Sequence, residues 1–76
     1  MIVAVIVRTT DPHRQSEALR AALGLTLRGA RVHAVVEGAA LTPLAQRSID
    51  TLRAFEHRVD GDLATAMRSD RIEVWT

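Results

Sequence analysis

The run IVAVIV at residues 2–7 decides the fold of this chain. Its residues are all apolar and mostly β-branched, and no polar residue alternates with them. This pattern is typical of a strand that is covered on both faces, as in the middle of a parallel sheet. The run therefore predicts an α/β domain rather than an open antiparallel sheet.

Further strands are predicted outward from this run, with helical patterns between them. RVHAVVEG at 31–38 is again nearly all apolar, and RIEVW at 71–75 closes the chain. The intervening stretches are long enough for right-handed parallel crossovers. Residues 57–59 are either a helix end or a short strand. The prediction is one compact three-layer α/β domain over residues 1–76, with a three- to four-stranded parallel sheet flanked by helices.

Two longer helices are expected, each with an apolar stripe. The first spans residues 12–28, is stopped by Gly29, and contains Gly24, which predicts a close packing contact. The second begins at Thr42, with Pro43 in the first helical position. The first stripe consists of Leu19, Ala22, Leu23 and Leu27, and the second of Ala45, Ile49, Leu52 and Phe55. A short third helix is expected after the cap residue Asp62.

Polar residues follow the first strand, at the end of a parallel sheet where ligands usually bind. The candidate ligand-binding residues are Arg8, Thr9, Thr10 and Glu37. The first three can hold a phosphate, sulfate or carboxylate, and Glu37 either pairs with Arg8 or acts as an acid or base. The alternative is a helix start, in which Asp11 is the cap. We favour the cap, because the loop lacks the glycines of phosphate-binding motifs.

The composition removes several classes of function. The chain has 76 residues and no cysteine, which excludes thiol nucleophiles, persulfide carriers, disulfides and thiolate metal sites. His13, His33 and His57 are far apart in sequence, and we expect His33 to be packed or hydrogen-bonded within its strand. We predict no catalytic residues, no metal and no cofactor, so the chain is more consistent with a non-enzyme.

Charge and hydropathy also limit the partners. The net charge is +1, the cations are scattered arginines, and Phe55 and Trp75 are the only aromatic residues, so we expect no nucleic-acid binding. No apolar run approaches the ~20 residues that cross a membrane. We expect a cytoplasmic protein that does not contact membranes. A chain this short is marginally stable alone, which favours an oligomer.

The stretch SEALRAALGLTLRGARVHAVVEGAAL (16–41) and the ending SDRIEVWT (69–76) resemble the DsrE/DsrF-like family. The resemblance implies a small parallel α/β fold that assembles into homo-oligomers, or into hetero-oligomers with related subunits. Some members carry sulfur as a cysteine persulfide in sulfur relays. The family's cysteine lies near the region that corresponds to residues 59–63, which holds none here. The resemblance therefore implies a non-catalytic assembly subunit, and the alternative is an anion-binding protein or enzyme using Arg8 and Glu37.

Overall fold

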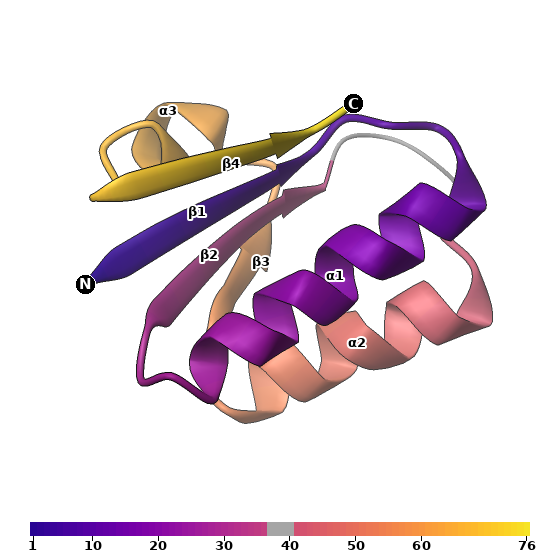
Figure 1. The fold of residues 1–76 in the computed structure, drawn as a ribbon, viewed down its shortest axis with the longest axis horizontal. Helices are drawn as coiled ribbons and strands as arrows, with labels where there is room; N and C mark the ends of the chain where they lie inside the picture. Colours follow the sequence, from indigo (N-terminus) through magenta and orange to yellow (C-terminus); the bar gives the residue numbers. More distant parts are fainter. Residues whose placement is uncertain (37–40) are drawn as a thin grey trace.

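The computed structural model describes residues 1–36 and 41–76. Strands and helices alternate along these residues (Figure 1). In chain order the elements are β1 (Ile2–Val7), α1 (Pro12–Thr26), β2 (Arg31–Val36), α2 (Pro43–Ala54), β3 (Arg58–Asp60), α3 (Leu63–Ala66) and β4 (Arg71–Trp75). Residues 37–38, which were predicted as the end of the second strand and include the candidate site residue Glu37, lie outside the described part.

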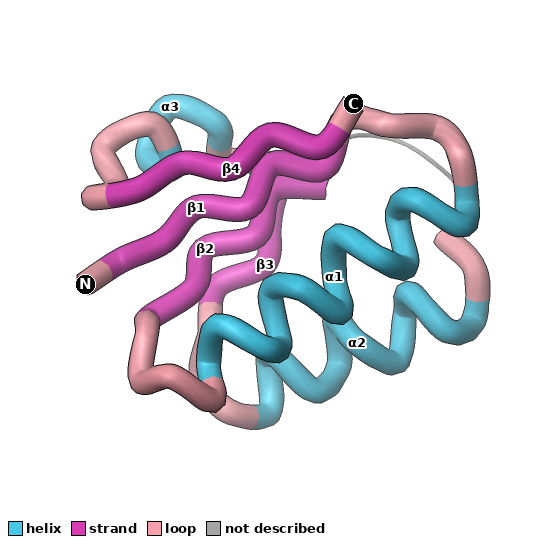
Figure 2. Tube along the Cα trace, viewed as in Figure 1, coloured by secondary structure: helices cyan, strands magenta, loops and turns pink. Residues whose placement is uncertain are grey.

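The four strands form one sheet in the order β3-β2-β1-β4, and all neighbours are parallel. The segment that the sequence left open, residues 57–59, is mostly strand, because the edge strand β3 beside β2 covers residues 58–60. β1 and β2 occupy the middle of the sheet, as their apolar runs predicted (Figure 2). The predicted fold class is confirmed.

The sheet has two differently covered faces. α1 and α2 lie side by side on one face, here called the α1/α2 face, and α3 lies on the opposite α3 face (Figure 1). Odd-numbered residues of β1 pack toward the two long helices, and the even-numbered Ala4 and Ile6 pack toward α3. This three-layer arrangement buries the centre of β1 on both faces. The continuous apolar character of residues 2–7 follows from that burial.

The helix ends follow from local capping chemistry. The Asp11 carboxylate accepts the backbone N–H of His13 at 2.9 Å, and the Thr42 hydroxyl accepts that of Ala45 at 3.1 Å. Both predicted caps are confirmed, and each is followed by a proline. Gly29 has a φ of 83°, a left-handed conformation that favours glycine, but α1 ends at Thr26, three residues before Gly29 and earlier than predicted.

Three expectations about the helices were wrong. Leu27 is 89% exposed and Phe55 is 70% exposed, although both were assigned to apolar stripes. α1 ends at Thr26 and α2 at Ala54, so each of these residues lies beyond the last helical position and is not held over the sheet. Gly24 makes no close packing contact, since a Cβ built there would meet no atom within 4 Å.

Candidate functional site

The loop after β1 is organised by its own hydrogen bonds. The backbone N–H groups of Arg8 and Thr9 both donate to the carbonyl of Trp75, at 2.9 and 3.1 Å. The Thr9 hydroxyl accepts the N–H of Asp11, and the side-chain amide of Gln15 donates to the Thr9 carbonyl. These bonds join the loop to β4 and to the first turn of α1. The loop therefore serves as the helix start that the sequence favoured.

The ligand-binding role of this loop stays a prediction. Arg8, Thr9 and Thr10 directly follow β1, so they lie at its carboxyl end as expected. Arg8 and Thr10 are exposed, and Thr9 is half-buried. Glu37, the fourth candidate, lies outside the described residues.

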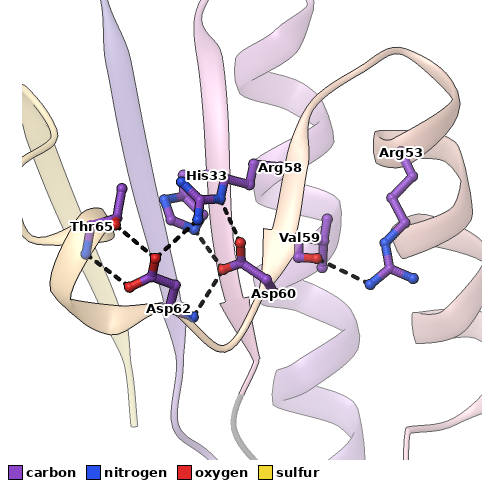
Figure 3. Close-up of polar contacts among 7 residues, drawn as sticks. All are labelled: His33, Arg53, Arg58, Val59, Asp60, Asp62 and Thr65. Atoms are coloured by element: carbon purple, nitrogen blue, oxygen red, sulfur yellow. Dashed lines mark hydrogen bonds and ion pairs between the residues drawn. The ribbon is translucent and has the colours of Figure 1, made fainter.

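A polar network lies on the α3 face of the sheet (Figure 3). His33 of β2 is 4% exposed, and its Nε2 lies 2.8 Å from Oδ1 of Asp60 in β3. Arg58 contacts the other carboxylate oxygen of Asp60 and reaches Oδ2 of Asp62 at 3.0 Å. Thr65 of α3 donates both its N–H and its hydroxyl to Asp62, at 3.1 and 2.7 Å. The network thus joins β2, β3 and α3.

The network favours ionised carboxylates. Partial burial of Asp60 raises its pKa, but hydrogen bonds from His33, the Asp62 N–H and Arg58 outweigh it and lower the pKa to about 2. The pKa of Asp62 is lowered chiefly by the hydrogen bonds from Thr65. The pKa of Arg58 is raised, first by its bond to Asp60. Because both oxygens of Asp60 are already bonded, the network is suited to holding β3 and α3 in place.

A pocket of about 360 Å³ adjoins this network. Three arginines line it: Arg31 and Arg58, which are the first residues of β2 and β3, and Arg68, which follows α3. The buried ring of His33 forms part of its wall. Arg31 donates at 2.8 Å to the backbone carbonyl of Glu56, which is also a lining residue. The pocket lies at the amino ends of the strands, opposite to the end that the sequence indicated.

The third feature is an apolar surface on the uncovered part of the α3 face. Ile72 and Val74 of β4 lie beside Ala4 and Ile6 of β1 in the sheet register, and are therefore on the α3 face. Ala4 and Ile6 are buried beneath α3, whereas Ile72 is 36% and Val74 is 52% exposed. Ile2, the first residue of β1, is also exposed. We call Ile2, Ile72 and Val74 the β4 apolar patch.

Fold and site together define a small three-layer parallel α/β domain with an arginine-lined pocket and an apolar sheet edge. Among residues 1–36 and 41–76, no group of three or more histidine, aspartate or glutamate side chains is placed to hold a metal ion. No helix in the same residues has the length and apolar character to cross a membrane. Comparison of the chain with protein-family models, curated proteins and solved structures gives no match.

Sequence reasoning anticipated part of this geometry. His33 is buried and hydrogen-bonded, as predicted, and Asp62 caps α3. The role of Asp60 was missed, because an aspartate before glycine is read as a turn signal. The pocket was also missed, because the general rule for parallel sheets directs attention to the carboxyl ends of strands.

Proposed function

We propose that this protein is a non-catalytic DsrE/DsrF-like assembly subunit. It acts as an oligomer with copies of itself or with related subunits, in association with sulfur-relay proteins. It does not carry a persulfide itself. The proposal includes a cytoplasmic location, where proteins without disulfides are the rule.

The β4 apolar patch is the observation that carries this proposal. Parallel sheets are usually covered on both faces. Among residues 1–36 and 41–76, one helix of four residues covers the α3 face, and Ile72 and Val74 beyond it remain exposed. A neighbouring subunit would remove these side chains from water. This burial would add stability to a chain of 76 residues, whose own core is small.

The turn between β3 and α3 supports the non-catalytic part of the proposal. The resemblance implies that the family's cysteine would lie near residues 59–63, after a middle strand and at the start of a helix. Asp60 and Asp62 occupy this turn, and Asp62 caps α3. A persulfide needs a thiolate, and carboxylates that are bonded within the protein do not replace it.

The oligomeric state tests this proposal. We expect native mass spectrometry and sedimentation of the purified chain at micromolar concentration to show a discrete multimer without excess mass. A stable monomer under these conditions would remove the main support for an assembly role. A multimer with a fixed extra mass would instead point to a bound small molecule.

Anion binding is the second candidate function, and the arginine-lined pocket favours it. Arg31, Arg58 and Arg68 are among the residues that line a cavity of the size that small ligands occupy. Guanidinium groups are suited to phosphate and carboxylate. This pocket is a different location from the Arg8 loop at the other end of the sheet.

Thermal unfolding with millimolar phosphate, against chloride at equal ionic strength, tests anion binding. An anion at 100 times its dissociation constant stabilises the folded state by about 2.7 kcal/mol. We expect Arg68→Ala to lose this stabilisation and Arg8→Ala to keep it. The reverse result would place the anion at the opening loop, and no stabilisation of the wild type would reject both sites.

A further inference from the structure

The two edges of the sheet differ in how they are protected. β3 has only three residues, and the guanidinium of Arg53 donates to its Val59 carbonyl at 3.0 Å (Figure 3). β4 has five residues, and three of them, including Ile72 and Val74, are exposed. A strand at the edge of a sheet presents N–H and C=O groups that can pair with another strand. β4 is therefore the edge that is open to pairing.

β4 carries opposite charges on one face and apolar residues on the other. Arg71 and Glu73 lie beside Val3 and Val5 of β1, on the α1/α2 face. They form an ion pair within the strand, with 3.6 Å between the guanidinium nitrogen and the carboxylate oxygen. Ile72, between them, points to the α3 face. A strand with this pattern is complementary to a second copy of itself in antiparallel orientation.

We propose that two copies of this chain associate through β4, in antiparallel orientation, about a two-fold axis at Ile72. This arrangement deepens the proposed function, on which it rests, by naming the partner and the contact. Arg71 then lies opposite Glu73 of the partner subunit, twice by symmetry. Ile72 lies opposite Ile72 of the partner subunit, and the two apolar patches become continuous across the α3 faces. The two sheets merge into one.

Charge selects this register over the neighbouring one. Moving the axis to Glu73 would place two glutamates directly opposite each other, which is destabilising in a sheet. The axis at Ile72 instead places opposite charges opposite each other. Val74 then faces Asp70 of the partner subunit. In each copy the Asp70 carboxylate accepts the backbone N–H of Ile2 at 2.7 Å, so it is held toward β1 rather than across the new contact.

Reciprocal charge variants test the register. Arg71→Glu gives each copy two acidic residues at the contact, and Glu73→Arg gives two basic ones, so each variant alone should repel itself. We expect each to weaken self-association by about tenfold to a hundredfold at low salt, because two symmetric pairs change from attraction to repulsion. An equimolar mixture should form a heterodimer, since the introduced glutamate meets the introduced arginine. The ion pair within each strand is broken in both variants and cannot produce this rescue.

Native mass spectrometry of wild type, single variants and mixture decides between the outcomes, because the two variants differ in mass. Circular dichroism confirms that each variant folds. Dimeric wild type with unaffected variants, or a mixture that does not associate, would overturn the β4 contact while leaving the assembly proposal in place. A wild type that is still monomeric at about 100 μM would overturn both proposals, because this concentration is well above the dissociation constant expected for a specific interface.

Ile72→Lys provides a second test that does not depend on the charge pair. At a two-fold axis the new lysine meets the lysine of the partner subunit, and an edge lysine opposes strand pairing. We expect this variant to be monomeric, and Ile72→Val, the matched control, to remain dimeric. An Ile72→Lys variant that dimerises like the wild type would reject the contact.

Discussion

Replacing Leu19 by alanine is expected to cost about 2–5 kcal/mol of unfolding free energy, as for other large-to-small changes in cores. Leu19 of α1 is fully buried against the α1/α2 face of the sheet. The loss combines the transfer of its side chain with the cavity left behind. A domain of this size has a total stability of roughly 4–11 kcal/mol, so the change removes a large part of it.

Urea denaturation at fixed protein concentration measures this effect. The concentration must be fixed because association changes apparent stability. Leu27→Ala is the matched control on the same segment, since Leu27 is exposed. We expect the control to stay within about 0.5 kcal/mol of the wild type. Equal losses at the two positions would contradict the packing described for α1.

Replacing Asp60 by alanine is expected to cost about 1–3 kcal/mol at neutral pH, because it removes the partner of the buried His33 Nε2. The effect should depend on pH. The pKa of Asp60 is lowered from 3.8 to about 2 in the folded protein. A lowered folded-state pKa stabilises the native state above the unfolded value, and this stabilisation is lost as the pH falls from about 4 to about 2.

The acid limb of stability is therefore the measurement for Asp60. The side chain of Asp60 is 33% exposed, so solvent screening reduces the pH-dependent part to about 1 kcal/mol. The difference between wild type and Asp60→Ala in urea should shrink between pH 4 and pH 2. Asp50→Asn on α2 is the control for the loss of one carboxylate outside this network. If the difference in unfolding free energy between the wild type and Asp60→Ala is as large at pH 2 as at pH 7, the ion-paired network is contradicted.

The fold was predictable because its signals are local. The apolar run at 2–7 indicated a central parallel strand, and Asp11 and Thr42 marked the starts of α1 and α2. Failures occurred where the end of an element mattered, as at Leu27 and Phe55. The apolar periodicity of the sequence continues past the last helical residue. Only residues within the helix, however, are held with their side chains over the sheet. The sequence pattern alone therefore assigned both residues to the core.

The candidate sites were less predictable because they depend on which strands become neighbours. His33 and Asp60 are 27 residues apart in sequence, and the pairing of β2 with β3 brings them together. The same assembly places three arginines around one pocket at the amino ends of the strands. No local pattern predicts such a meeting, since each residue taken singly is an ordinary surface or turn residue.

The sequence by itself determined the class of fold, the helix starts and the absence of thiol chemistry, because each rests on local periodicity, on capping or on residue identity. Only the tertiary structure decided which face of the sheet stays partly uncovered. The chain folds α1 and α2 onto one face and leaves α3, with four residues, for the other. The exposed edge at Ile72 and Val74 is a consequence of that unequal covering, which depends on the three-dimensional arrangement and not on the composition of β4.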